Sequence, residues 1–234
     1  RTIAAFDHDI LKLMQEDVRT AVITMPAGAV TANIYQDFHP GKTYSAASDT
    51  SRGTGQDDAI TVVVDTKTGY VVADIQNNLI PPDQLAIASM ALLARYHNPI
   101  WAIEDNDAGI LTIATAQAAR YPALYYRESE KAGWHTDERN RWLLWGELIE
   151  AVNARLLTVA SESGLAQFYS VIRNPEKEGR IEGARGAHDD YPMAVGIAWQ
   201  MRRYARPMGR PMRNPMEDSW GDIMRRSSLA KGRW

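Results

Sequence analysis

The order of apolar and polar positions divides most of the chain into short strands and amphipathic helices. Apolar residues recur with helical spacing between Asp9 and Val18. Pro26 and the Pro40–Gly41 pair then interrupt any regular pattern. We therefore interpret residues 1–44 as an entry segment whose pattern indicates no function.

Between residues 44 and 75 the pattern becomes that of β-strands. Three β-branched or apolar runs, at 44–49, 59–65 and 70–75, predict three strands. The turn-rich segment 50–58 separates the first two runs, and a tight turn at 66–69 joins the last two. The first run ends in the carboxylate of Asp49.

From residue 81 onward, helices and strands alternate. Thr136 and Ser161 are suitable N-caps for two of the helices, and a turn at 174–179 lies between two extended pieces. Helices are expected at 81–96, from 109 to about 120, at 136–155, 161–169 and 191–204, and strands at 100–104, 123–126 and 156–159. This order predicts an α/β fold in which a mixed sheet, three antiparallel-type strands followed by parallel ones, has helices on both faces.

Amino-acid composition limits the kinds of catalytic and metal site more than it limits the fold class. The 234 residues are 45% hydrophobic and 24% charged, as expected for a globular domain, and no apolar run approaches the length of a membrane span. The absence of cysteine excludes thiol catalysis, thiolate zinc sites and disulfides. With five His and 29 Asp and Glu, a metal ion would be held mainly by carboxylates, which suit Mg²⁺ or Mn²⁺.

Charge is unevenly distributed along the chain. Residues 202–234 contain nine Lys and Arg against three Asp and Glu, a balance of +6, so the first 201 residues carry −9 and the whole chain −3. A basic tail on an acidic body indicates a nucleic acid or an acidic partner, or else simply a solvated terminus.

Three separated acidic positions are candidates for catalysis. Asp49 and Glu104 each end a predicted strand, and Asp189 and Asp190 open the last helix. Taken singly, each has an ordinary explanation as a turn residue, an exposed strand end or a helix cap. Together, clustered carboxylates repel one another unless cations lie between them, and two divalent ions about 4 Å apart would serve both that need and phosphodiester hydrolysis.

Three stretches of the chain are similar to motifs of a known family. They are Ser48–Asp65, with an acid, a glycine turn and a second strand; Ile103–Gly109, with acid–x–Asn–x–x–Gly; and Glu182–Ala194, with His–Asp–Asp before a helix. In this order and spacing they resemble the C-terminal nuclease domain of the large terminase subunit of tailed bacteriophages. The resemblance covers roughly residues 40 to 204, and Gly133–Thr136 before the long helix also fits it.

The resemblance implies an RNase H-like fold and a metal-dependent endonuclease that cuts double-stranded viral DNA concatemers during genome packaging. Asp49 matches the first acid and Glu104 the second, and the third is Asp189 or Asp190. His188 and Asp58 are then possible accessory ligands. The implied cofactors are two Mg²⁺ or Mn²⁺ ions, the implied partners are DNA, the portal protein and the small terminase subunit, and the implied location is the host cytoplasm rather than the mature virion.

The ATPase activity of that family is not expected in this chain. The stretch Pro40–Thr43 supplies only the end of a phosphate-binding loop, and position 36 is Gln where that loop requires Gly. We therefore expect 1–40 to be a linker or remnant of a preceding ATPase domain, 41–205 the nuclease domain, and 206–234 a basic C-terminal tail that could dock on the portal or on DNA.

Basic residues supply candidate contacts to DNA phosphates, without reading sequence. The preferred guiding element is the predicted hairpin before the third acid. The candidate DNA-binding residues are Arg52, Arg173, Lys177, Arg180 and Arg185.

Two other functions are compatible with the same pattern. One is a resolvase or transposase-like nuclease, against which the lack of a recognisable site-specific DNA module argues. The other is an RNase H-like module that has lost catalysis and docks on the portal, against which the three filled acidic positions argue.

Overall fold

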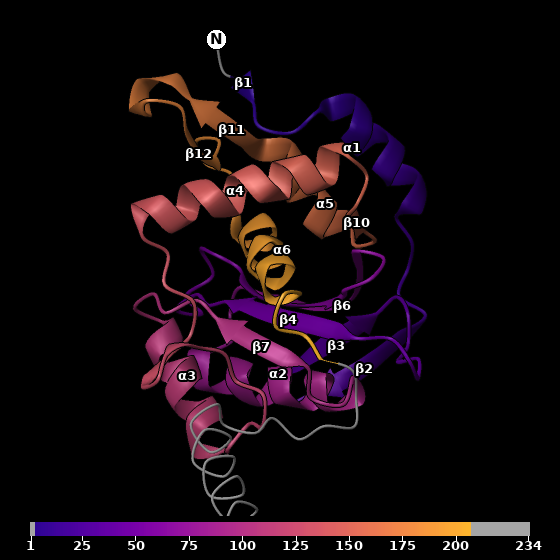
Figure 1. The fold of residues 1–234 in the computed structure, drawn as a ribbon, viewed down its shortest axis with the longest axis vertical. Coiled ribbons are helices and arrows are strands. Elements are labelled where there is room, and N and C mark those ends of the chain that lie inside the picture. Colours follow the sequence, from indigo (N-terminus) through magenta and orange to yellow (C-terminus); the bar gives the residue numbers. More distant parts are fainter. Residues whose placement is uncertain (1–2, 207–234) are drawn as a thin grey trace, which may run out of the picture.

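The computed structural model describes residues 3–206 (Figure 1). The helices are α1 (His8–Met14), α2 (Pro82–Arg95), α3 (Gly109–Ala118), α4 (Glu138–Asn153), α5 (Glu162–Ser170) and α6 (Asp190–Met201), with short 3-10 turns η1 (Gln15–Asp17) and η2 (Pro175–Lys177). The strands are β1 (Ile3–Ala4), β2 (Ile23–Ala27), β3 (Val30–Ile34), β4 (Tyr44–Asp49), β5 (Ala59–Asp65), β6 (Tyr70–Asn77), β7 (Ile100–Ile103), β8 (Tyr126–Glu128), β9 (Lys131–Ala132), β10 (Thr158–Val159), β11 (Val171–Asn174) and β12 (Arg180–Gly183). Within these residues, no helix is both long and apolar enough to cross a membrane.

A seven-stranded mixed sheet forms the centre of the fold. Its order is β2-β3-β6-β5-β4-β7, and β10 pairs with β6 beside this path. The pairs β4–β5 and β5–β6 are antiparallel, whereas β4–β7 and β6–β10 are parallel. The predicted mixed α/β class is therefore confirmed.

The entry segment contributes more to the fold than its sequence suggested. Strands β2 and β3 form a hairpin that joins the sheet through pairing of Asn33 and Ile34 with β6, so the expected boundary at residue 40 does not separate a linker from the sheet. Pro26 lies in β2 and masked this strand in the sequence. Because β2 is the edge strand, a proline there does not remove a bond needed by a further strand.

Residues 123–126 also differ from the expectation. Instead of a regular strand, Leu124 forms a single parallel bridge with Trp101 of β7, and the strand β8 begins at Tyr126. The predicted hairpin around 174–179 is present as β11, η2 and β12, and β1 pairs with β11 as a third strand. The basic tail from residue 207 lies outside the described residues.

Helices cover both faces of the sheet, as predicted. In β5, Val62 and Val64 face a core shared with α1, α4, α5 and α6, whereas Val63 faces a second core shared with α2 and α3. Figure 1 shows α2 and α3 on one side of the sheet and α6, covered by α4, on the other. This two-sided burial explains why the central strands are continuous apolar runs rather than alternating ones.

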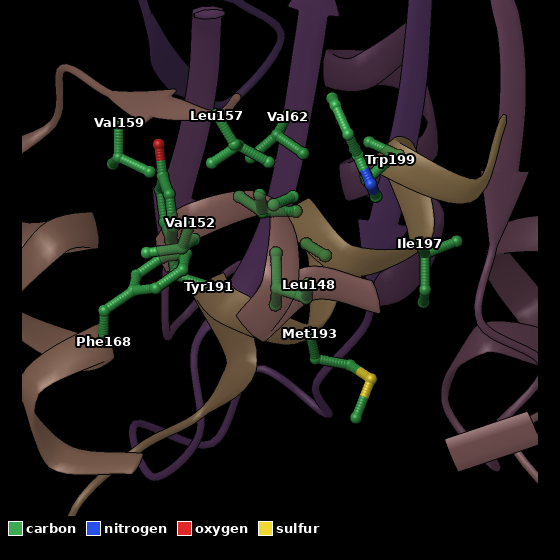
Figure 2. Packing of buried hydrophobic residues seen from close by; sticks show 14 of the residues in the cluster. Val62, Leu148, Val152, Leu157, Val159, Phe168, Tyr191, Met193, Ile197 and Trp199 are labelled. Atoms are coloured by element: carbon green, nitrogen blue, oxygen red, sulfur yellow. The ribbon is translucent and has the colours of Figure 1, made fainter. Parts of the chain in front are cut away.

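Helix α6 is buried along almost its whole length. Eleven of its 12 residues are buried, and Figure 2 shows Tyr191, Ile197 and Trp199 of this helix within the apolar cluster. Gly196 faces α4, where a Cβ atom would lie only 2.6 Å from Leu144. The position of the first turn of α6 is thus set by packing against both the sheet and α4.

The packing of α5 on Tyr191 gives a test of this arrangement. A Cβ on Gly164 would lie 2.4 Å from the ring of Tyr191, a fully buried residue whose hydroxyl donates to Asp74 Oδ2. We expect Gly164→Ala to lower the free energy of unfolding by about 1–3 kcal/mol through overpacking.

Gly146, on the exposed side of α4, is the matched control, because beyond its chain neighbours and the nearby helix backbone no atom lies within 4 Å of an added Cβ. Gly146→Ala should raise stability by about 0.5–1 kcal/mol through helix propensity. Urea unfolding measures both changes. Equal stabilities of the two variants would contradict the packing described for Tyr191.

Candidate metal centre

The first two acids meet because their strands are parallel neighbours. Ser48 pairs with Ile103 in the β4–β7 register, and the Glu104 N–H donates to the Ser48 carbonyl at 2.9 Å. Asp49 and Glu104 therefore leave the same edge of the sheet side by side. Asp49 is only 8% exposed, whereas Glu104 is half-buried.

Asn106 ties the two carboxylates together. Its Nδ2 donates to Glu104 Oε2 at 3.2 Å and to Asp49 Oδ1 at 3.4 Å, and its Oδ1 accepts from the Gly109 N–H at 2.7 Å. A Cβ on Gly109 would collide with the Glu104 carbonyl oxygen at 1.8 Å. These contacts give the acid–x–Asn–x–x–Gly motif a physical reason.

Thr136 also contacts the second acid, where the sequence analysis expected a helix cap. Its hydroxyl donates to Glu104 Oε1, and Asp137 takes the N-cap position by accepting from the Asn140 N–H at 2.7 Å. The N-cap expectation for Thr136 was therefore wrong by one residue. The reason is that a strong capping residue follows directly and leaves the Thr136 hydroxyl free for Glu104.

The two aspartates of the third position have different surroundings. Asp189 Oδ2 accepts from Arg141 Nη2 at 3.3 Å. Asp190 Oδ2 instead accepts from the Asp58 N–H at 3.0 Å and lies 3.6 Å from His188 Nδ1. The guanidinium of Arg141 thus compensates the charge of Asp189, whereas Asp190 is not paired with a Lys or Arg among the described residues.

All four acids line one small cavity of about 200 Å³. Its lining consists of Asp49, Thr50, Ser51, Asp57, Asp58, Glu104, Asn106, Arg141, Asp189, Asp190 and Met193. Arg141 is the one Lys or Arg in this lining, and it already contacts Asp189. The described part of the chain therefore supplies far more negative than positive charge to the cavity.

The pKa values of Asp49, Asp189 and Asp190 reflect burial and this excess of negative charge. Burial raises the pKa of Asp49 well above its usual range, and the charges of Glu104 and Asp190 raise it further. Burial also raises the pKa of Asp190 to about 7, with added repulsion from Asp189 and Asp57 and partial relief from the Asp58 N–H. For Asp189, burial raises the pKa, and Arg141 opposes this rise.

This donor set fits a hard divalent cation. Carboxylate and hydroxyl oxygens are ligands that suit Mg²⁺ and Mn²⁺. A cation between the acids would offset the repulsion that adds to the effect of burial on the pKa values of Asp49 and Asp190. The hydroxyl of Thr50, which also lines the cavity, is buried without a hydrogen-bond partner among the described residues.

Asp57 is a candidate that the sequence analysis missed. Oxygen or nitrogen atoms of Asp57, His188 and Asp190 all lie within 4.8 Å of one another, a grouping able to hold a metal ion. The sequence analysis chose the neighbouring Asp58, whose carboxylate instead accepts from Gln76 and Gln167 at 2.7 and 2.9 Å. The Asp57–Asp58 doublet alone could not separate the two roles.

The candidate DNA-binding residues occupy two regions. Arg52 is exposed on the β4–β5 loop and forms an ion pair with Asp107. The other four, Arg173, Lys177, Arg180 and Arg185, lie on or next to the β11–β12 hairpin. Lys177 and Arg185 line a groove of about 790 Å³ that shares Arg141 and Asp189 with the acidic cavity, so the hairpin borders this cavity.

Comparison with solved structures identifies the fold. The large terminase nuclease of thermophilic phage G20c with bound magnesium matches over 85% of this chain and 97% of that one, with a TM-score of 0.66 and 14% identity. The nuclease domain of the Thermus phage P74-26 large terminase also matches, with a TM-score of 0.57 and 16% identity over 82% of this chain and 94% of that one. A point mutant from the large terminase subunit of bacteriophage Sf6, with calcium, matches with a TM-score of 0.56 and 11% identity over 84% of this chain and 99% of that one.

This chain has the fold of a large terminase nuclease domain. Neither the comparison with protein-family models nor that with curated protein sequences gives a match. The low identities mean that the likeness rests on the arrangement of elements, and the terminase resemblance stated from three motifs is confirmed at the level of the fold.

The raised pKa of Asp190 predicts a pH dependence of stability in the absence of metal. An unfolded Asp titrates near about 3.9, whereas the folded group has a pKa of about 7. Between these values the folded state binds a proton that the unfolded state has lost, so the free energy of unfolding falls as pH rises through this window. Asp190→Asn removes the contribution.

Thermal unfolding in EDTA at pH 5 and pH 7.5 measures it. The unmodified chain should lose more stability over this interval than Asp190→Asn, while Asp107→Asn, which alters an exposed acid, should behave like the unmodified chain. The same loss of stability between the two pH values in the unmodified chain and in Asp190→Asn would contradict the raised pKa of Asp190.

Proposed function

We propose that this chain is a divalent-metal-dependent endonuclease of the large terminase type, which hydrolyses phosphodiester bonds in double-stranded DNA. The observation that carries the proposal is the joining of Asp49, Glu104 and Asp190 in one cavity of a fold shared with terminase nucleases. The magnesium and calcium bound to two of those nucleases support a site for hard divalent cations.

Asp49, Glu104 and Asp190 would hold the metal, with Asp57 and His188 at the open rim. When bound, divalent ions supply positive charge that lowers the pKa of water and stabilises negative charge on the phosphodiester. Asn106 keeps the first two carboxylates in register, since it donates to both. Without cations, the clustered carboxylates would repel a DNA phosphate.

Asp190 is the proposed ligand of the adjacent pair, and Asp189 the partner of Arg141. Repulsion from Asp190 raises the pKa of Asp49 more than repulsion from Asp189 does, so Asp190 interacts more strongly with the first acid. Arg141 also donates to the Ile181 carbonyl at 3.2 Å. The Arg141–Asp189 pair thus joins α4 and the β12 strand to the start of α6.

The hairpin groove is the proposed path of one DNA strand. Arg185 and Lys177 line it, and Arg173 and Arg180 lie on its strands. Lys177 and Arg180 both contact Glu182, so part of their charge is compensated, whereas Arg185 is exposed without an ion pair in the described part of the chain. Such contacts bind phosphates and give little sequence preference.

The biological setting follows as a further part of the proposal. The substrate would be concatemeric viral DNA, cut during packaging in the host cytoplasm with two Mg²⁺ or Mn²⁺ ions. The portal protein and small terminase subunit would be partners.

Plasmid cleavage tests the function. The chain should nick or linearise plasmid DNA with Mg²⁺ or Mn²⁺ and not with EDTA. Asp49→Asn and Glu104→Gln should each reduce the rate by at least about a hundredfold, because losing a ligand removes several kcal/mol of transition-state stabilisation. Cleavage by both variants at the unmodified rate would refute the assignment, and Asp9→Asn, which alters an exposed acid of α1 outside the cavity lining, serves as the control.

Comparison of the two neighbouring aspartates tests the ligand assignment. Asp190→Asn should abolish cleavage and weaken Mn²⁺ binding, measured by calorimetry. Asp189→Asn should bind Mn²⁺ with an affinity within a few-fold of the unmodified chain, because Asp189 is proposed to contact Arg141 and not the ion. The reverse order of Mn²⁺ affinities would show that Asp189 is the ligand.

A further inference from the structure

Gln167 bridges two segments of the acidic site from outside it. This residue lies on α5, is 9% exposed, and is not part of the cavity lining. Its Oε1 accepts from the Tyr191 N–H at 2.8 Å, and its Nε2 donates to Asp58 Oδ2 at 2.9 Å. One amide thus holds the first turn of α6 and the end of the β4–β5 loop.

Asp58 passes this constraint on to the third acid. Its carboxylate also accepts from Gln76 Nε2 at 2.7 Å, and Gln76 in turn accepts from the Ser163 hydroxyl at 2.7 Å. The main-chain N–H of Asp58 donates to Asp190 Oδ2 at 3.0 Å. These contacts fix the end of the β4–β5 loop, which includes the N–H that contacts Asp190 and the neighbouring residue Asp57.

The two ends of the Gln167 amide are not interchangeable. The acceptor faces a main-chain N–H and the donor faces a carboxylate, and both partners are part-buried or buried. A Met of similar length provides neither bond, and a Glu keeps the acceptor but places a second negative charge beside Asp58. Loss of either bond leaves a polar group unsatisfied in a poorly solvated region.

We propose that Gln167 is a positioning residue for the metal centre, which orients Asp190 and the Asp57-bearing loop through Tyr191 and Asp58. The inference rests on the proposed function, because it assumes that Asp190 holds a divalent ion. Groups that orient metal ligands without touching the metal typically change metal affinity 10- to 100-fold when they are replaced.

Mn²⁺ binding by the purified chain, measured by calorimetry together with thermal unfolding, tests the proposal. Gln167→Met should bind Mn²⁺ at least about tenfold more weakly. The matched control is Gln200→Met, since Gln200 is a 5% exposed glutamine on the same helix as Asp190 that donates to Glu147 and accepts from Arg203. It should lose stability while retaining the unmodified Mn²⁺ affinity.

A pair of compensating changes separates positioning from general destabilisation. In the double variant Asp58→Asn with Gln167→Glu, the introduced amide can donate one hydrogen to the introduced carboxylate, which still accepts from the Tyr191 N–H. The second amide hydrogen of the introduced Asn can be donated to Gln76 Oε1 if the Gln76 side-chain amide flips by 180°. The Gln76 Nε2 then donates to the Ser163 hydroxyl, which can accept as well as donate. The charge of the pair is conserved. The double variant should regain most of the affinity that Gln167→Met loses.

The outcomes distinguish this proposal from the proposed function. If the unmodified chain binds no Mn²⁺, the metal centre itself fails and the positioning role falls with it. If the unmodified chain binds Mn²⁺ and Gln167→Met binds equally well, only the positioning role is overturned. Equal weakening by Gln167→Met and Gln200→Met, or no recovery in the double variant, overturns it as well.

Discussion

The site depends on the burial of α6 between the sheet and α4. A helix with eleven of its 12 residues buried has little freedom to slide or tilt, so its first turn is fixed relative to the ends of β4 and β7. Ser45 of β4 adds a direct bond, because its hydroxyl donates to the Ala198 carbonyl of α6 at 2.8 Å. Apolar packing thus holds carboxylates together that would otherwise repel one another.

The same packing explains the unusual ionisation of the acids. Burial raises the pKa values of Asp49, Asp189 and Asp190, and mutual repulsion adds to this effect for Asp49 and Asp190. Of the three, only Asp189 has an Arg within contact among the described residues. A divalent ion would offset the unfavourable charge of Asp49 and Asp190. The repulsion within the cluster and its proposed metal binding therefore have the same cause, the burial of several carboxylates close together.

Much of this arrangement could be predicted from the sequence. The runs at 44–49, 59–65 and 70–75 became β4, β5 and β6 nearly residue for residue, because buried central strands give long apolar signals. The hairpin β2–β3 was missed, since an edge strand with alternating burial and a proline lacks that signal. The order of three motifs indicated the terminase fold, which the solved structures confirm.

The distinction between neighbouring acids could not be predicted. Asp57 and Asp58, like Asp189 and Asp190, are adjacent in sequence and chemically identical, and only long-range partners separate their roles. Those partners, Gln167 on α5 for Asp58 and Arg141 on α4 for Asp189, are remote in the chain. No local pattern indicates such contacts.

Anomalous diffraction from a crystal of this chain soaked in Mn²⁺ tests the central claim most directly. The account predicts an anomalous peak within coordination distance of Asp49 and Asp190, with Asp189 still bound to Arg141. A peak coordinated by Asp189 in place of Asp190 would contradict the ligand assignment, and the absence of any peak in the acidic cavity would contradict the metal centre itself.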